Sequence, residues 1–290
     1  MAAQNWMCTG LRWSPEGPAL LWSGGRRSAL VPGKRVAFGV RDGVARRCVG
    51  ARGHPCPTGA TVPARSTGAR CDECARLDRA HSVAADTLAD DPRPYRVYLA
   101  WFGPGLVKVG ITGEERGSAR LLEQGAVCFS WLGTGPLMAA RRTEELLRAA
   151  LGVPDRIPYA VKRAVRASLP DTVEERAAEV VALHARAVSL GNWPEALVPA
   201  PCRVTDHMDV FGLQRAGAAT GAVTGLVAGG RVAGELVAAA GPDLHLAVEG
   251  RGVLVLDTRL LPGWELTPAQ AEGEVTVPVK EFGAHQDGLF

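Results

Sequence analysis

The sequence predicts a mixed α+β protein, with β-rich regions at both ends and a helix-containing centre. The 290 residues are 47% hydrophobic and 22% charged, which is typical of a folded, soluble chain. Both ends hold short apolar runs separated by glycines, a pattern of short strands, whereas the centre shows the periodicity of amphipathic helices. The formal net charge of +3 is too balanced to indicate a nucleic-acid partner from bulk charge alone.

The N-terminal region, residues 1–47, predicts strands at Ala19–Trp22 and Val36–Val40. Its beginning lacks a basic stretch followed by an apolar one, so we expect no secretory signal and a cytoplasmic protein. The most lipid-like stretch, Ala216–Gly230, is uncharged for only fifteen residues, five of them glycines. It is too short to cross about 30 Å of hydrocarbon, so no membrane partner is expected.

Residues 48–93 have little apolar periodicity but hold four of the seven cysteines: Cys48, Cys56, Cys71 and Cys74. Clustered cysteines in a reducing compartment indicate metal binding before disulfides, and four thiolates match one tetrahedral zinc ion. Four protein ligands close the coordination sphere, so the ion is expected to be structural. His54 is an alternative fourth ligand, and four unrelated reduced thiols remain the other interpretation.

Residues 95–112 predict a hairpin of two alternating strands around a Gly-Pro-Gly turn. Pairing about this turn gives one apolar face, in which three residues oppose three others: Val97, Leu99 and Trp101 against Ile111, Val109 and Val107. The other face sets Tyr98 opposite Gly110 and Ala100 opposite Lys108, with Thr112 nearby. Because Gly110 has no side chain, this face is predicted to be the floor of a pocket.

Helices are predicted after the hairpin at residues 118–124, 137–151 and 173–190, the last preceded by a T-x-x-E capping box at Thr172 and Glu175. One side of the first helix presents three polar residues at helical spacing: Arg116, Arg120 and Gln124. In the second helix Glu144 lies at the edge of the apolar stripe, whereas Glu145 faces water. A carboxylate at the edge of a core is usually paired or bound to a cation.

Several of these features together resemble the GIY-YIG endonuclease superfamily, over about residues 95–152. They are V-Y-L around Tyr98, K-V-G-I-T at residues 108–112, an Arg-led helix and a later Ala-x3-Glu helix. The resemblance implies that Tyr98 is the tyrosine of the first motif, that Arg120 lies beside the scissile phosphate and that Glu144 holds one divalent metal ion. Lys108 replaces the second tyrosine, Gln124 occupies a place where some members carry histidine, and the GIY triplet is absent.

The layout of the whole chain is also similar to an uncharacterised bacterial family that is carried as a domain of unknown function. Residues beyond 199 repeat short apolar runs, which we interpret as β-hairpins, for example in G-A-V-T-G-L-V-A-G-G-R-V-A-G-E-L-V and V-L-V-L-D-T-R-L-L-P-G-W-E-L. We therefore expect a β-rich region, a zinc module, a GIY-YIG-like α+β domain and a second β-rich domain, at residues 1–47, 48–93, 94–198 and 199–290.

The expected function is metal-dependent cleavage of phosphodiesters in DNA or RNA. A single Mg²⁺ or Mn²⁺ on Glu144 would stabilise the leaving oxygen, Arg120 the phosphate charge, and Tyr98 or Lys108 would position or deprotonate water. Substrate contacts are expected from Gly110, Thr112, Arg116 and Gln124. The alternatives are an inactive nucleic-acid-binding protein and an enzyme that uses the pocket for a small molecule. A run of basic residues is a further candidate for phosphate contacts: Arg141, Arg142, Arg148, Arg156, Lys162, Arg163 and Arg166.

Overall fold

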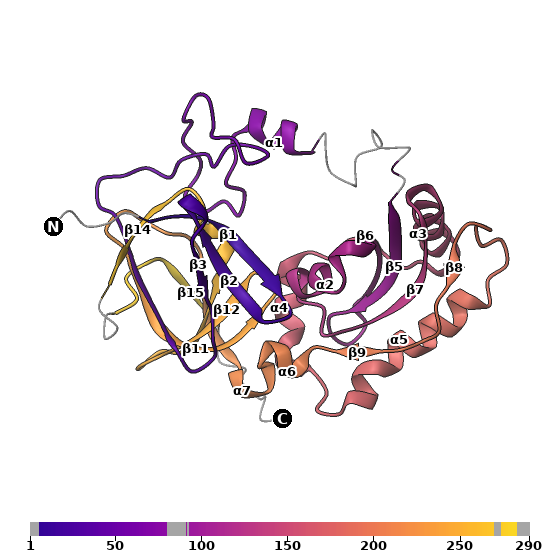
Figure 1. Ribbon diagram of the computed structural model, residues 1–290. Coiled ribbons are helices and arrows are strands. Elements are labelled where there is room, and N and C mark those ends of the chain that lie inside the picture. Colours follow the sequence, from indigo (N-terminus) through magenta and orange to yellow (C-terminus); the bar gives the residue numbers. More distant parts are fainter. Residues whose placement is uncertain (1–5, 80–90, 92, 270–273, 283–290) are drawn as a thin grey trace. The chain divides into compact units, whose positions relative to one another are not determined.

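The protein is a mixed α+β structure in two compact units, as the sequence predicts for the fold class (Figure 1). The computed structural model describes residues 6–79, 91, 93–269 and 274–282. Unit 1 consists of Met1–Ala85 together with Arg215–Phe290, and unit 2 of Asp86–Gln214. Among the described residues, no helix is both long and apolar enough to cross a bilayer.

Unit 1 contains a ten-stranded sheet that mixes strands from both ends of the chain. Figure 1 shows the indigo N-terminal strands beside the orange and yellow C-terminal ones. The sheet order is β15-β10-β13-β12-β11-β4-β14-β1-β2-β3. The N-terminal strands are β1 (Trp6–Ser14), β2 (Gly17–Trp22), β3 (Arg27–Ala29) and β4 (Arg35–Val40). The C-terminal strands are β10 (Ala219–Val223), β11 (Arg231–Ala240), β12 (Asp243–Val248), β13 (Gly252–Asp257), β14 (Glu265–Pro268) and β15 (Val279–Glu281). Two 3₁₀ turns, η1 (Ser23–Gly25) and η4 (Thr258–Leu260), join them.

The strand positions agree with the sequence, but the predicted hairpin pairing is wrong for both C-terminal segments quoted above. Strand β10 pairs with β13, in parallel, and with β15 rather than with β11. Strand β14 pairs with β1 and β4 rather than with β13. True hairpins form only where short turns join neighbours, as in β11–β12 and β12–β13. Pairing is decided by which apolar faces are buried together, and a short Val/Ala-rich run does not specify its partner.

A buried arginine fastens the Cys-rich segment to this sheet. Arg46 is 1% exposed, and its guanidinium donates only to backbone carbonyls, those of Pro63, Ser66, Arg259 and Pro262, at 2.5–3.0 Å. Gly263 allows the chains to approach, because a Cβ there would lie 2.1 Å from the Arg47 carbonyl oxygen. The segment that follows ends in helix α1 (Asp72–Arg79).

Unit 2 is built on a five-stranded sheet with the order β6-β5-β7-β8, in which β9 also pairs with β7. The strands are β5 (Pro94–Trp101), β6 (Val107–Gly113), β7 (Cys128–Pro136), β8 (Val198–Pro199) and β9 (Thr205–Asp206). The predicted hairpin register is confirmed: Tyr98 pairs with Gly110, Leu99 with Val109 and Ala100 with Lys108. The face of the sheet that carries each side chain is therefore the one that the sequence predicts.

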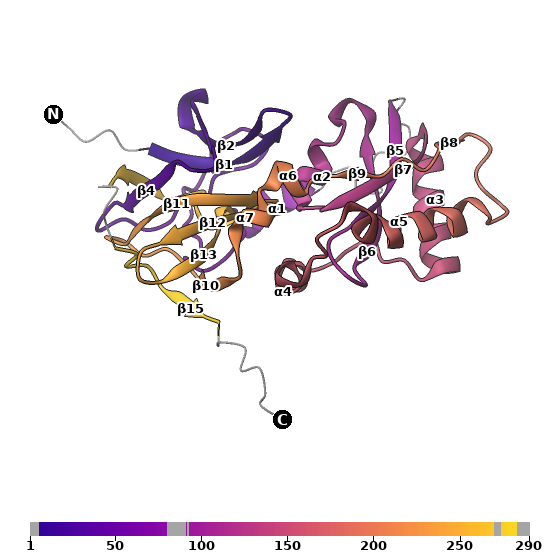
Figure 2. The same ribbon diagram turned by 90° about the horizontal axis from the view of Figure 1, so that it is seen from below.

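Helices flank both sides of this sheet. In Figures 1 and 2, α2 (Ala119–Gln124) lies on one side, and α3 (Leu137–Leu151) and α5 (Val173–Val188) lie on the other. The Thr172 capping box is confirmed, because the Thr172 hydroxyl accepts from the Glu175 amide. The remaining helical segments are η2 (Glu114–Arg116), α4 (Tyr159–Ala164), η3 (Val165–Ser168), α6 (Met208–Phe211) and α7 (Leu213–Ala216).

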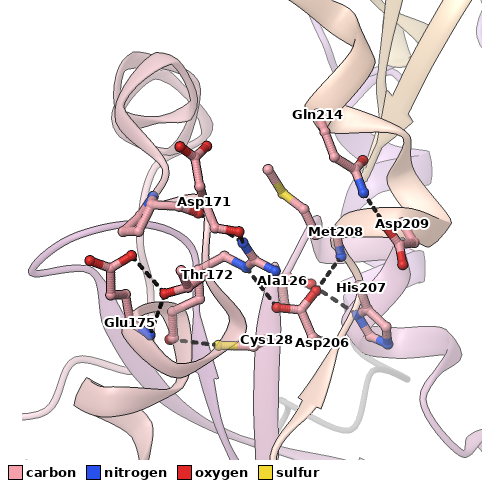
Figure 3. Close-up of polar contacts among 12 residues, drawn as sticks. Ala126, Cys128, Asp171, Thr172, Glu175, Asp206, His207, Met208, Asp209 and Gln214 are labelled. Carbon is pink, nitrogen blue, oxygen red and sulfur yellow. Dashed lines mark hydrogen bonds and ion pairs between the residues drawn. The ribbon is translucent and has the colours of Figure 1, made fainter.

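A buried ion pair joins the start of α5 to β9 (Figure 3). The side chain of Arg176, 4% exposed, donates to the Asp206 carboxylate at 2.7 Å and to the carbonyls of Pro170 and Asp171. The Cys128 thiol donates to the Arg176 carbonyl at 3.0 Å. These residues hold α5 against β7 and β9, so they have a structural role.

Candidate functional site

The four clustered cysteines come together within unit 1. The sulfurs of Cys48, Cys56, Cys71 and Cys74 all lie within 4.8 Å of one another, and the Cys56 and Cys71 sulfurs are 3.9 Å apart. A tetrahedral zinc ion with Zn–S bonds of about 2.3 Å separates its sulfurs by about 3.8 Å. The cluster therefore has the dimensions of a four-coordinate metal site.

Local backbone geometry forms the two halves of this cluster. Cys71 directly precedes α1 and Cys74 lies in its first turn, so the C-x2-C pair presents both sulfurs from a helix start. In the other half, the Cys48 sulfur accepts hydrogen bonds from the amides of Gly50 (3.4 Å) and Cys71 (3.2 Å), which fix its position. At Gly50 φ is +78°, and a Cβ would lie 1.9 Å from the His54 carbonyl oxygen, so only glycine fits this turn.

The four cysteines and His54 differ in position as candidate metal ligands. His54 is exposed, and within the described part of the chain the group that could hold a metal consists of the four cysteines alone. A hydrogen bond with the Thr58 hydroxyl lowers the pKa of Cys56 to about 6, so this thiol ionises readily. The other three cysteines lie outside the cluster: Cys8 and Cys128 are buried and Cys202 is exposed.

Tyr98 lies on the hairpin face of unit 2 that was predicted to be the floor of a pocket, and its own side chain fills the space above Gly110. Its side chain is 1% exposed and lies directly over Gly110, where a Cβ would come within 2.4 Å of the phenol oxygen. The Gln124 amide, itself buried, donates to that oxygen at 2.8 Å. Burial raises the pKa of Tyr98, so the phenol stays protonated. Gly110 thus makes room for the tyrosine, and Gln124 fixes the ring from α2.

Lys108 lies beside Tyr98 on the same face. Its ammonium is 5.7 Å from the centre of the Tyr98 ring and donates to the Asp155 carbonyl at 2.9 Å. The side chain is 8% exposed, and burial, together with the charge of Arg120, lowers its pKa to about 8. An appreciable fraction of this amine is therefore neutral near physiological pH.

The two arginines that precede and begin α2 share one carboxylate. Glu123 lies 2.7 Å from the Arg116 guanidinium and 3.7 Å from that of Arg120. Both arginines are exposed, and the charges of both lower the pKa of Tyr98. They therefore form a positive rim beside the phenol that a solvent-borne anion can reach.

Glu144 approaches from α3, near the edge strand β6. It is half-buried, whereas Glu145 is exposed and paired with Arg148, as predicted from the helical periodicity. Within the described residues the Glu144 carboxylate makes no hydrogen bond or ion pair. Burial raises its pKa, while the nearby charge of Lys108 opposes that effect. Its charge in turn acts on the pKa values of Tyr98 and Lys108.

The loop that holds Asp155 and Arg156 was not foreseen from the sequence, whereas Thr112 was. The loop after α3 lies against β6, because the Val109 amide donates to the Pro154 carbonyl at 3.0 Å. It brings the charges of Asp155 and Arg156 to Lys108. On the same face of β6, the Thr112 hydroxyl is buried without a hydrogen-bond partner among the described residues. An unsatisfied buried hydroxyl is uncommon, which makes Thr112 a candidate to bind a ligand.

The predicted basic run does not form one continuous face. Lys162 is buried, with its ammonium 3.6 Å from the Phe102 ring centre and donating to the Gln124 carbonyl. Arg148 is paired with Glu145. A separate cavity of about 410 Å³ is lined by Arg142 and Glu195 and includes none of the predicted site residues.

Comparisons with known proteins identify the family but name no activity. No curated protein and no solved structure matches the chain. A family model described as "Protein of unknown function (DUF2797)" matches residues 33–266, which includes the four cysteines and all the predicted residues of the Tyr98 site. Because this match covers most of the 290 residues, the chain belongs to the DUF2797 family.

Proposed function

We propose that unit 2 cleaves phosphodiester bonds of DNA or RNA with a divalent metal ion, in the manner of a GIY-YIG nuclease. The proposal is carried by two charged side chains on different helices that act on the same two residues of the hairpin. The charges of Arg120 on α2 and Glu144 on α3 both act on Tyr98 and Lys108, which lie in the hairpin. Groups whose environments perturb one another in this way are concentrated at functional sites.

The protein groups divide into those that bind the phosphate and those that handle protons. Arg116 and Arg120, held by Glu123, would contact the phosphate oxygens. Since Gln124 donates to the Tyr98 oxygen, the phenol proton is left to donate toward the substrate or a water molecule. Lys108, with a pKa near 8, would accept a proton from the attacking water. The Thr112 hydroxyl is available for a further substrate contact.

Glu144 is the residue that fits a divalent ion. It is a half-buried carboxylate without a protein partner in the described residues, and Asp155 adds a second negative charge nearby. Hard cations such as Mg²⁺ and Mn²⁺ prefer carboxylate oxygens. When bound, such an ion supplies charge stabilisation to the leaving oxygen.

The test is cleavage of plasmid and single-stranded substrates by the purified protein with Mn²⁺ or Mg²⁺. Arg120→Ala should lower kcat by roughly 10²-fold to 10³-fold, the effect of removing one donor that stabilises transition-state charge. Glu144→Gln should abolish metal-dependent cleavage. The matched control is Glu145→Gln, one residue along the same helix, which should leave the rate unchanged.

Three outcomes would decide between this proposal and its alternatives. Equal loss of activity in Glu144→Gln and Glu145→Gln would point to helix damage and contradict the assigned role. Salt-dependent binding without any cleavage would favour an inactive nucleic-acid-binding protein, an alternative that the deep burial of Tyr98 supports. No affinity for DNA or RNA would leave an enzyme acting on a small molecule.

For the four cysteines of unit 1 we propose a structural zinc ion. The apolar cluster around them is small, with Val62 and two alanines beside the cysteines themselves, so the segment lacks a core of its own. Four protein sulfurs leave no open position for a substrate. Elemental analysis of protein purified without chelators should find one zinc per chain, and a Cys71→Ser/Cys74→Ser variant should lose it.

A further inference from the structure

The positive charge of this protein is concentrated in its first 79 residues. They hold 13 Lys and Arg, of which twelve are Arg, against 5 Asp and Glu. The remaining 211 residues hold 20 Lys and Arg against 25 Asp and Glu. The small net charge of the chain therefore conceals a strongly basic N-terminal part.

This charge is presented to solvent. Every Lys and Arg in the described residues 6–79 is exposed, apart from Arg46. Two of these arginines pair with acids of the same segment, Arg70 with Asp78 and Arg76 with Glu73. Others, such as Arg12 and Arg27, make no ion pair with any described residue.

The strand register places Arg12 and Arg27 on one face of the ribbon β1-β2-β3. Arg12 pairs with Ala19, and Arg27 pairs with Leu21. Ala19 and Leu21 are two residues apart on β2, so their side chains point to the same side. Leu20, between them, is buried, which shows that the Arg12 and Arg27 face is the solvent face. The ribbon ends at β3, an edge of the sheet.

The basic run of unit 2 is a weaker candidate for the same role. Unit 2 as a whole holds 15 Lys and Arg against 16 Asp and Glu. As described above, Lys162 is buried and Arg148 is neutralised by Glu145. Unit 2 therefore carries no net positive charge, unlike the N-terminal part of the chain.

We infer that the solvent face of the β1-β2-β3 ribbon, centred on Arg12 and Arg27, binds the phosphate backbone of a nucleic acid. Arginine outnumbers lysine twelve to one in this part, and its planar fork matches phosphate oxygens better than an ammonium does. An anionic membrane would also attract the charge, but Ala19, Leu21 and Ala29 give this face no large apolar side chain except one leucine to insert. That the ligand is a nucleic acid rests on the proposed function, whereas the location of the binding surface follows from the charges and the strand register alone.

The test measures binding separately from cleavage. Full-length Glu144→Gln protein, without divalent metal, is titrated against a fluorescein-labelled DNA duplex and a labelled RNA strand at several salt concentrations. Adding Arg12→Gln and Arg27→Gln should weaken binding and reduce the slope of log K against log salt by about 1.8 for the duplex and about 1.4 for the single strand, since each lost phosphate contact removes about 0.9 or about 0.7. The matched control is Arg142→Gln with Arg148→Gln, which removes the same charge from unit 2 and should change the slope little.

The outcomes separate this inference from the proposed function. An unchanged slope in the Arg12 and Arg27 variant, or an equal loss in the control, would overturn the ribbon as the binding surface whatever the protein cleaves. Binding to anionic vesicles but to neither nucleic acid would also overturn it. Because Arg12 and Arg27 are exposed and make no ion pair in the described structure, their replacement should leave the circular dichroism spectrum unchanged. A variant that binds nucleic acid normally but no longer cleaves it would instead test the proposed function of the Tyr98 site.

Discussion

In the described part of the chain, each unit buries one arginine, and the two charges are satisfied in different ways. In unit 2, Arg176 donates hydrogen bonds to the carboxylate of Asp206 and to two backbone carbonyls. In unit 1, Arg46 meets four backbone carbonyls and no carboxylate. Its partners come from residues 63–66 and 259–262, so the guanidinium joins segments that are far apart in sequence. Unit 1 is therefore held together by contacts between the two ends of the chain, whereas unit 2 is formed by one continuous stretch, residues 86–214.

The sheets differ in the same way. Strands β5, β6 and β7 of unit 2 follow one another within residues 94–136 and pair with one another. In unit 1, strands β4 and β11 pair although about 190 residues separate them. Besides Arg46, unit 1 has other contacts between distant parts of the chain: the Trp13 indole donates to the Gly241 carbonyl at 2.8 Å, and Arg41 pairs with Glu265 at 2.7 Å. The cysteine cluster acts over a shorter distance, within residues 48–74.

The largest expected effect comes from removing the metal. Chelation, or Cys71→Ser with Cys74→Ser, should unfold residues 46–79, because structural zinc contributes roughly 10–16 kcal/mol of apparent binding energy in small zinc modules. Hydrogen exchange should rise throughout this segment, whereas the β5–β7 amides of unit 2 should keep their protection. Unchanged exchange at Cys48 and in α1 after complete metal removal would contradict the zinc proposal.

The same contrast explains what the sequence could predict. The hairpin register, α3 and the positions of Glu144 and Glu145 follow from periodicity and one tight turn, all local signals. The cysteine group follows from spacing, because few other chemistries bring four thiols together. The sequence could not predict the contacts of Arg46 or the β10–β13 and β14–β4 pairings. A short Val/Ala strand or a single arginine does not specify which part of the chain it contacts. Asp155 was missed for a similar reason, as only tertiary packing places its loop against β6.

The buried arginines provide the next largest effect. Arg176→Met should lower the free energy of unfolding by up to about 3–5 kcal/mol, because it leaves the half-buried Asp206 carboxylate without its cation and with the Met208 amide as its remaining donor among the described residues. Arg46→Met leaves up to four backbone carbonyls without a hydrogen-bond donor. Each carbonyl that water cannot reach should cost about 1–3 kcal/mol of stability. Chemical denaturation of each variant measures both losses.

A second substitution distinguishes the two arrangements. Asp206→Asn in the Arg176→Met background should recover part of the loss, because it removes the unpaired charge. No side-chain substitution can rescue Arg46→Met, since its acceptors are all backbone. If Asp206→Asn made the Arg176→Met protein still less stable, the ion pair would not be the main contribution of Arg176.

A smaller, pH-dependent effect is expected at Lys108. Its folded-state pKa of about 8 lies below the ordinary 10.5, so its charge opposes folding at pH 7. Between pH 8 and 10.5 the folded state loses this proton before the unfolded state does, so the native protein should gain stability relative to Lys108→Met as pH rises, by about 1–3 kcal/mol. Denaturation of both proteins at pH 7 and pH 10 measures the difference, and the titration of the cysteines cancels between them. If the two proteins differed in stability by the same amount at pH 7 and pH 10, the charge of Lys108 would not oppose folding.

The smallest effect concerns two adjacent carboxylates of α3 and tests whether the Tyr98 site sacrifices stability for function. Burial raises the pKa of Glu144, which means that its charge opposes folding above that pKa. Glu144→Gln should therefore stabilise the protein at neutral pH, by less than about 1 kcal/mol because the side chain is only half-buried, and the gain should vanish as acidification protonates Glu144 in the native protein. Glu145→Gln loses its pair with Arg148 and should destabilise by about 0.3 kcal/mol. Thermal unfolding of both variants at pH 7 and at acidic pH measures these changes in stability. If Glu144→Gln lowered the stability more than Glu145→Gln does, Glu144 would be a structural residue rather than a ligand for a cation.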